Sequence, residues 1–140
     1  MSLVSGLNVD RSTKKWTKDR DYFDFNSYQL PAGVGNFYDL ISQKVEAKTI
    51  LRIREIQTYV NQYVDWTKVQ WDFCINGIPI YPLNARTDQI GAPGQLMYIG
   101  ENTIECPGGS VFSVRITNLD GAAAHIGGVT VRGEWGNYIR

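Results

Sequence analysis

The sequence predicts an all-β protein, an antiparallel β-sandwich of about eight strands. Apolar and polar residues alternate along several short segments, which is the pattern of strands that bury one face and expose the other. Asn76-Gly77 lies between two apolar segments and is the strongest short signal for a hairpin turn. Pro79 and Pro82 follow it, and they indicate an edge strand because proline cannot donate to a strand ladder.

Residues 1–20 are expected to form an amino-terminal arm ahead of a single domain at 21–140. They are polar and show no strand or helix periodicity before Trp16. Two interpretations stay open: a solvated, partly disordered tail, or a segment that orders only against a neighbouring subunit, with Trp16 as its anchor. The basic side chains of the arm are Arg11, Lys14, Lys15, Lys18 and Arg20.

Asp21 to Leu30 is the first expected strand, because Phe23 and Phe25 share one parity. Several nearby aspartates raise calcium binding as an alternative. The segment lacks the central glycine and the terminal glutamate of an EF-hand loop. No metal site is therefore predicted among Asp19, Asp21 and Asp24.

Residues 31–35 are expected to form a loop, and no element is assigned to 36–43. Ala47 to Val60 is the next predicted strand, and its apolar residues change parity near Arg54-Glu55. A β-bulge explains this change, because one extra residue restores the inward direction and bends the strand. A helix is the alternative, but the β-branched content favours a strand.

The clearest alternation of the chain runs from Val69 to Ile75. The return arm after the Asn-Gly turn is 78–82. Leu83 to Gln95 is a long polar loop, and long loops on a rigid β scaffold often carry function. Short strands are expected at 95–99 and 102–105.

Residues 108–138 are expected to form a long β-hairpin. Asn118 to Gly121 supplies the turn chemistry between its arms. Gly133 falls on the inner parity of the second arm, where a facing backbone can come close. The other inner residues are Phe112, Val114 and Ile116 in the first arm and Val129, Val131 and Trp135 in the second. Such a hairpin cannot bury its apolar face alone, so other strands must form a second layer.

The composition limits the function classes. The 140 residues fit one domain, and 14 basic side chains balance 14 acidic ones, so no overall field attracts nucleic acid or an anionic membrane. No secretory signal precedes the domain, and no apolar run approaches the about 20 residues of a membrane span. Synthesis in the cytoplasm is therefore expected, with Cys74 and Cys106 as free thiols.

Catalytic chemistry is sparse in this sequence. His125 is the only histidine, so a site with two or three histidine ligands cannot form. Neither a Gly-x-Ser-x-Gly elbow nor a phosphate-binding glycine loop occurs. The chain is expected not to be an enzyme and to use no cofactor or metal.

The aromatic residues suggest binding rather than catalysis. Trp71 and Trp135 are expected in the core, because they lie on the buried parity of their strands. Nucleic-acid binding would need basic residues interleaved with exposed rings, and only Arg52 and Arg54 approach that pattern.

Residues 45–140 resemble the viral jelly roll. The most specific part is the end, where PGGSVFSVRITNLDG followed by IGGVTVRGEWG is similar to the closing strands of small virion proteins from tailed bacteriophages. The resemblance implies a capsid cement or decoration protein, a homotrimer seated on the capsid surface that cross-links and stabilises the shell. No catalytic motif belongs to this pattern.

On this hypothesis an aromatic patch binds sister subunits and the basic arm binds acidic side chains of the major capsid protein; nucleic acid and membrane are not partners. The expected partner-binding residues are Arg11, Lys14, Lys15, Trp16, Lys18 and Arg20. The alternative function is a carbohydrate- or receptor-binding module of a tail or surface appendage, with Tyr63, Trp66, Arg86 and Asp88 as its site. A small sandwich enzyme is a third possibility, and it requires clustered carboxylates in a cleft.

Overall fold

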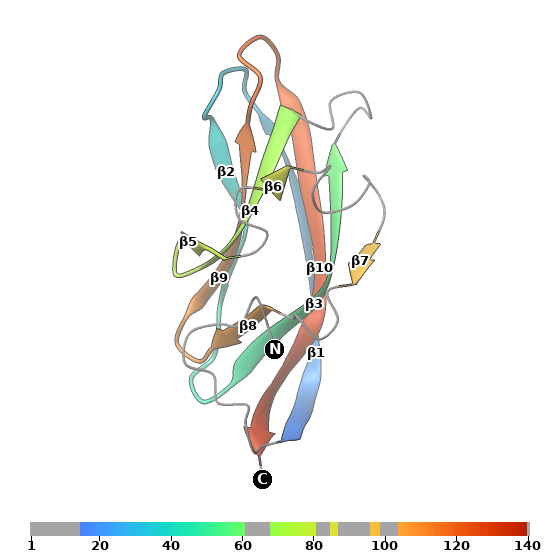
Figure 1. Ribbon diagram of the computed structural model, residues 1–140, viewed down its shortest axis with the longest axis vertical. Helices are drawn as coiled ribbons and strands as arrows, with labels where there is room; N and C mark the ends of the chain where they lie inside the picture. The colour runs from blue at the N-terminus through green and yellow to red at the C-terminus, as the bar shows by residue number, and fades with distance from the viewer. Residues whose placement is uncertain (1–14, 61–67, 81–84, 87–95, 99–103, 140) are drawn as a thin grey trace.

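A computed structural model describes residues 15–60, 68–80, 85–86, 96–98 and 104–139. Its strands pack as two five-stranded antiparallel sheets, which form the two layers of a sandwich (Figure 1). Sheet 1 contains β1 (Lys15–Leu30), β10 (His125–Ile139), β3 (Ile50–Val60), β7 (Leu96–Tyr98) and β8 (Ile104–Pro107). Sheet 2 contains β2 (Phe37–Lys44), β9 (Val111–Asn118), β4 (Val69–Ile75), β5 (Ile78–Pro79) and β6 (Ala85–Arg86). The predicted all-β sandwich is confirmed.

The strand order is that of a jelly roll. Sheet 1 has the order β1-β10-β3, with β7 and β8 both paired to β3, and sheet 2 has the order β2-β9-β4, with β5 and β6 both paired to β4. Successive strands change sheet at each step from β1 to β4, and again between β6 and β7, between β8 and β9 and between β9 and β10. Because β5 and β6 have only two residues each, the described residues hold eight longer strands, as predicted.

The predicted hairpin of residues 108–138 is wrong in its pairing. Both arms are strands with the expected buried parity, but β9 pairs with β2 and β4, whereas β10 pairs with β1 and β3. The connection between them therefore passes from one layer to the other. Alternation identifies a strand and its buried face, but it carries no information about which strand lies beside it.

The first strand begins earlier than the sequence indicated. β1 pairs with β10 from Lys15↔Ile139 to Leu30↔His125, with a register shift between Lys18 and Arg20. The boundary of the amino-terminal arm is therefore corrected, because residues 15–20 belong to the sheet; residues 1–14 lie outside the described residues. β1 is the edge strand of its sheet, and most of its side chains are exposed and polar. Residues 15–20 therefore lack the alternation that identifies a strand.

The bulge predicted near Arg54-Glu55 is confirmed. Arg132 of β10 lies opposite Glu55, and the next residue, Gly133, lies opposite Ile53, which leaves Arg54 as the extra residue. A Cβ at Gly133 would overlap the carbonyl oxygen of Arg52. The close backbone approach expected at this glycine is therefore present, and only a hydrogen atom fits there.

The predicted turn at Asn76-Gly77 is also confirmed. Both residues have positive φ, 53° at Asn76 and 78° at Gly77, as a type I′ turn requires. The turn joins β4 to the short β5, which lies at the end of sheet 2. Pro79 therefore marks an edge strand, as predicted, and Pro82 lies outside the described residues.

The core lies between the two sheets and contains Trp71 and Trp135, as predicted. The indole nitrogen of Trp71 donates a hydrogen bond to the carbonyl oxygen of Gly128, 3.1 Å away in the opposite sheet. Cys74 and Cys106 are buried free thiols, as predicted, and they lie in different sheets. Burial raises the pKa of both thiols, that of Cys106 to about 12.

Candidate functional site

Two groups of exposed apolar side chains stand out on the described surface. Nine large apolar residues are exposed there, and seven of them gather in two places. We call the first group the aromatic face; its members are Phe23, Phe25 and Tyr59. We call the second group the edge patch; its members are Tyr28, Val34, Phe37 and Tyr38. Such clusters on a protein surface indicate binding surfaces.

The aromatic face lies on the outer side of sheet 1. Phe25 of β1 pairs with Thr130 of β10, which in turn pairs with Gln57 of β3. One step along, Gly128 pairs with Tyr59 on its other side. Directly paired residues point to the same face of a sheet, so these side chains form one outward surface. Its rings are freely accessible, with 67% exposure at Phe25 and 49% at Tyr59.

A depression of about 260 Å³, which we call the trough, runs between these two rings. Gly128 lies at its centre and contributes no side chain, so the surface is hollow between Phe25 and Tyr59. The residues that line the trough are Phe25, Asn26, Ser27, Gln57, Thr58, Tyr59, Gly128, Val129 and Thr130. The lining is aromatic and polar, and it contains no charged residue.

A second depression, of about 470 Å³, lies further along the same face. Its lining is charged and consists of Asp21, Tyr22, Phe23, Arg54, Glu55, Arg132, Gly133 and Glu134. These side chains bind one another: Arg132 stacks 5.4 Å above Phe23, and Arg54 lies 3.4 Å from Glu134. Asp21 is paired at 2.7 Å with Lys18.

These contacts concern the third possibility, a small sandwich enzyme with carboxylates clustered in a cleft. Three carboxylates line the charged depression, but two of them, Asp21 and Glu134, are held by cations. Among the described residues no three acidic, histidine or cysteine side chains are close enough to hold a metal ion. His125 is buried against Asp120, with Nε2 and Oδ2 2.8 Å apart. This arrangement is typical of a structural ion-pair network.

The edge patch lies where the two sheets end. β1 and β2 are the terminal strands of the described strand orders, and Tyr28 of β1 stacks on Tyr38 of β2 with centroids 3.9 Å apart. The amide of Asn26 donates to the carbonyl oxygen of Leu40 at 3.0 Å and joins the same two strands. Val34, in the β1–β2 loop, is 71% exposed. The two tyrosines are therefore fixed against each other at the open edge of the sandwich, whereas Phe37, next to Tyr38 in β2, points to the outer face of sheet 2.

A charged pair borders the edge patch. The guanidinium of Arg115 lies 4.2 Å above the ring of Phe37 and binds Asp39 at 2.8 Å. The hydrogen bond to Asp39 raises the pKa of Arg115 further above its usual value, so this side chain keeps its charge. An exposed ring with an arginine stacked on it is a common feature of protein interfaces.

The β9–β10 connection holds the loop that carries Val34. Gly33 donates its backbone N–H to the carbonyl oxygen of Asp120 at 3.0 Å, and Gly35 donates to that of Asn118 at 2.9 Å. The Asn118 amide also donates to the carbonyl oxygen of Pro31, at 2.9 Å. The position of the edge patch therefore depends on residues about 85 positions later in the chain.

Asp120 fixes the conformation of this connection. Its carboxylate accepts hydrogen bonds from the ring of His125 and from the backbone N–H of Ala122, each at 2.8 Å. Both contacts favour the ionised form, and they lower the pKa of Asp120, with the hydrogen bond to His125 as the larger cause.

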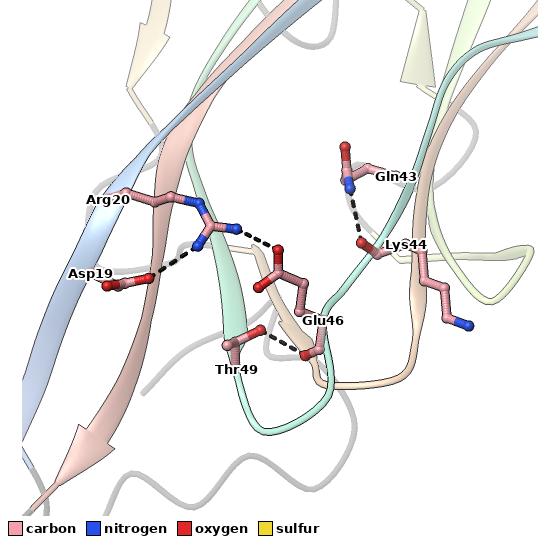
Figure 2. Close-up of polar contacts among 6 residues, drawn as sticks. All are labelled: Asp19, Arg20, Gln43, Lys44, Glu46 and Thr49. Carbon is pink, nitrogen blue, oxygen red and sulfur yellow. Dashed lines mark hydrogen bonds and ion pairs between the residues drawn. The ribbon is translucent and has the colours of Figure 1, made fainter.

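The structure places four of the predicted partner-binding residues in β1, namely Lys15, Trp16, Lys18 and Arg20. Figure 2 shows Arg20 between two carboxylates, 3.0 Å from Asp19 and 2.6 Å from Glu46 in the β2–β3 connection. Trp16 donates to Glu134 at 2.8 Å. Arg11 and Lys14 lie outside the described residues, and a partner-binding role for the set stays a prediction.

Most of the predicted sugar-binding set lies outside the described residues, and its role stays a prediction. Tyr63, Trp66 and Asp88 lie outside the described residues, and Arg86 belongs to β6 in sheet 2. The trough of sheet 1 is a feature that sequence reasoning missed. The sequence places Phe23 and Phe25 on the same face of one strand, but it does not show that this face points outward.

Comparisons with known proteins add little. No protein-family model and no curated protein matches the chain. A structure of infectious bursal disease virus, Gx strain, is similar over 84% of this chain at 16% identity, with a TM-score of 0.39. The chain spans 33% of the length of that matched chain.

No described helix is long and apolar enough to cross a membrane.

Proposed function

We propose that this chain is a non-enzymatic structural protein of a virion, a cement or decoration protein that stabilises a bacteriophage capsid through contacts between copies of itself. The observation that carries the proposal is the edge patch. It sets four exposed apolar side chains where both sheets of a jelly roll end. Exposed apolar side chains beside open strand edges favour association with protein.

The composition of the edge patch supports a contact between copies. Tyr28 and Tyr38 are stacked before any partner arrives, so little side-chain entropy is lost on binding. Arg115 and Asp39 form a polar rim next to the apolar centre, which is the usual anatomy of an interface. A homotrimer, as the resemblance implies, would bury one edge patch per subunit.

Attachment to the shell is assigned to the amino-terminal end. We assign capsid binding to the basic residues predicted for the arm, with Arg11 and Lys14 ahead of β1. Weak contacts of this kind add through effective concentration when three subunits bind one lattice. The partner would be the major capsid protein, and the place would be the capsid surface.

Light scattering tests the self-association. The wild-type chain is expected to be a trimer at micromolar and at tenfold lower concentration. Replacing Val34 and Phe37 together by serine should give a folded monomer, because the contact loses its apolar centre. Ile78→Ser is the matched control, since Ile78 is a similarly exposed apolar residue outside the patch, and it should leave the trimer intact.

Two results contradict the proposal. The first is a double variant that stays trimeric. The second is a wild-type monomer that decorates isolated shells no better than the double variant does.

A carbohydrate-binding function is the second candidate, and a different observation favours it. The trough has the uncharged polar and aromatic lining that a sugar needs. The trough and the edge patch share no residue, so one chain can bind through both.

A further inference from the structure

We infer that the trough between Phe25 and Tyr59, on the outer face of sheet 1, is a binding site for one neutral sugar ring of a glycan. The inference deepens the carbohydrate-binding candidate, on which it rests, and does not depend on the structural role. It is argued from three observations: two exposed rings, a floor with no side chain at Gly128, and a lining without charge.

The walls of the trough suit the apolar faces of a sugar. Phe25 belongs to β1 and Tyr59 to β3, with β10 between them. Neighbouring strands lie about 4.8 Å apart, so the two wall strands are separated by roughly 10 Å. Aromatic faces carry partial negative charge and attract the C–H groups that line one side of a sugar ring. A ring can therefore lie between the two side chains.

The floor of the trough is fixed before any ligand binds. A Cβ at Gly128 would lie 3.0 Å from the Cβ of Ser27, which is tighter than ordinary packing, so glycine keeps the floor open. From below, the Trp71 indole holds the Gly128 carbonyl oxygen at 3.1 Å. β10 is also paired with a strand on each side. A preformed floor reduces the entropy lost on binding.

The polar groups of the trough match hydroxyl groups. Ser27 and Thr130 carry hydroxyls, and Gln57 carries an amide that both donates and accepts. These three residues come from three different strands. Because no lining residue is charged, nothing in the trough compensates the desolvation of an ionic ligand. A neutral hexose is therefore favoured over an acidic sugar.

The size of the trough limits the ligand to one ring. Its volume of about 260 Å³ is smaller than the roughly 300–1,000 Å³ of sites for drug-sized molecules. An open site of this kind is expected to bind weakly, with a dissociation constant of about 1 mM. Several copies on one particle would raise the apparent affinity.

A glycan array and saturation-transfer NMR with glucose, galactose, mannose and N-acetylglucosamine test the inference on the full chain. At least one neutral sugar should bind, and sialic acid should not. Phe25→Ala and Tyr59→Ala should each weaken binding about tenfold or more, because each removes one stacking wall. Thr130→Val keeps the shape and should weaken binding by a smaller factor.

Ile78→Ala is the matched control. Ile78 is an exposed apolar residue of β5 in sheet 2 and lines neither depression, so this variant should bind sugar as the wild type does. All three alanine positions are exposed, and thermal unfolding should confirm that each variant is folded.

Three results overturn the inference: no neutral sugar binds, only acidic sugars bind, or Phe25→Ala and Tyr59→Ala bind as well as Ile78→Ala. The monomeric double variant of the edge patch separates the two proposals. It should keep the affinity for a single sugar whether or not the wild type forms trimers.

Discussion

The edge patch and the aromatic face both expose aromatic rings, but they differ in what lies between the rings. In the edge patch, Tyr28 and Tyr38 stack directly with centroids 3.9 Å apart, so the surface is filled. On the aromatic face, Phe25 and Tyr59 stand diagonally across β10, where Gly128 between Ser27 and Tyr59 contributes no side chain, and the surface is hollow. Exposure alone therefore does not specify a partner. A filled apolar surface suits another protein, whereas a hollow polar one suits a small polar ligand.

The two regions also differ in how the surrounding strands and loops hold them in place. The aromatic face lies over β10, which has a ladder on both sides. The edge patch lies on terminal strands, and its loop is held by the β9–β10 connection through the bonds of Gly33 and Gly35. We therefore expect perturbations of that connection to change self-association before they change sugar binding.

The largest loss of stability is expected from substitutions of Trp71, which lies in the core beneath the trough. Trp71→Ala should lower the free energy of unfolding by about 3–5 kcal/mol, since it leaves a large cavity, and both surfaces should be lost. Trp71→Phe should cost less, about 1–3 kcal/mol, from the unpaired Gly128 carbonyl group. Urea unfolding measures both values. Weakened self-association in folded Trp71→Phe, with intact sugar binding, would contradict the assigned link between Trp71 and the trough.

The next effect is expected at Gly133, beneath the aromatic face. Gly133→Ala places a methyl group against the carbonyl oxygen of Arg52, so β10 and β3 must separate locally. A loss of about 2–4 kcal/mol in the free energy of unfolding should follow. Gly121→Ala is the control, because its new methyl group meets only Val34, at 3.8 Å, and its change should stay within about 0.5 kcal/mol. Equal effects of the two substitutions would refute the assignment.

Acid is expected to act on the edge patch first. The folded protein lowers the pKa of Asp120 below its ordinary value of 3.8, so the unfolded chain takes up the proton more readily. The stabilisation from this group is therefore present above pH 3.8 and is lost as the pH falls through the lower, folded-state pKa. Thermal unfolding between pH 2 and 6 measures the loss. Asp120→Asn should be less stable at pH 6 and less sensitive to acid, and an unchanged acid slope in this variant would count against the prediction.

The smallest effect concerns the two thiols, which report separately on the two sheets. Burial raises the pKa of Cys106 to about 12, so neither thiolate is available near neutral pH and both cysteines should resist iodoacetamide in the native protein. Cys106 should react more slowly than Cys74, because it is the more deeply buried thiol. Mass spectrometry of the labelled peptides measures the order, and fast native labelling of Cys106 would show that sheet 1 opens readily.

Several elements were predictable because their signals are local. The alternation in β4 and the Asn76-Gly77 turn depend only on neighbouring residues, and both are present. The bulge at Arg54 was predictable because the buried parity reverses there. β2 was missed for a related reason. Its own register shift sets Leu40 and Ile41 side by side in the core, and the alternation is broken within eight residues.

The candidate sites were less predictable than the fold. The trough needs Phe25, Gly128 and Tyr59 on one surface, and these residues come from three strands that are far apart in the chain. The sugar-binding set proposed from the sequence was Tyr63, Trp66, Arg86 and Asp88 instead, and only Arg86 belongs to the described residues. The exposure of Phe25 could not be predicted from the sequence either, because aromatic residues lie on both faces of β1.

Local sequence patterns predict most of the strand segments, the turn at Asn76-Gly77, the bulge in β3 and the buried parity of β9 and β10, but neither β2 nor the start of β1. Tertiary structure alone decided which sheet each strand joins, above all that β9 and β10 lie in different layers. The physical reason is that periodicity reports how one strand divides its side chains between two faces, whereas pairing depends on packing between residues distant in the chain. The edge patch and the trough are both products of that pairing.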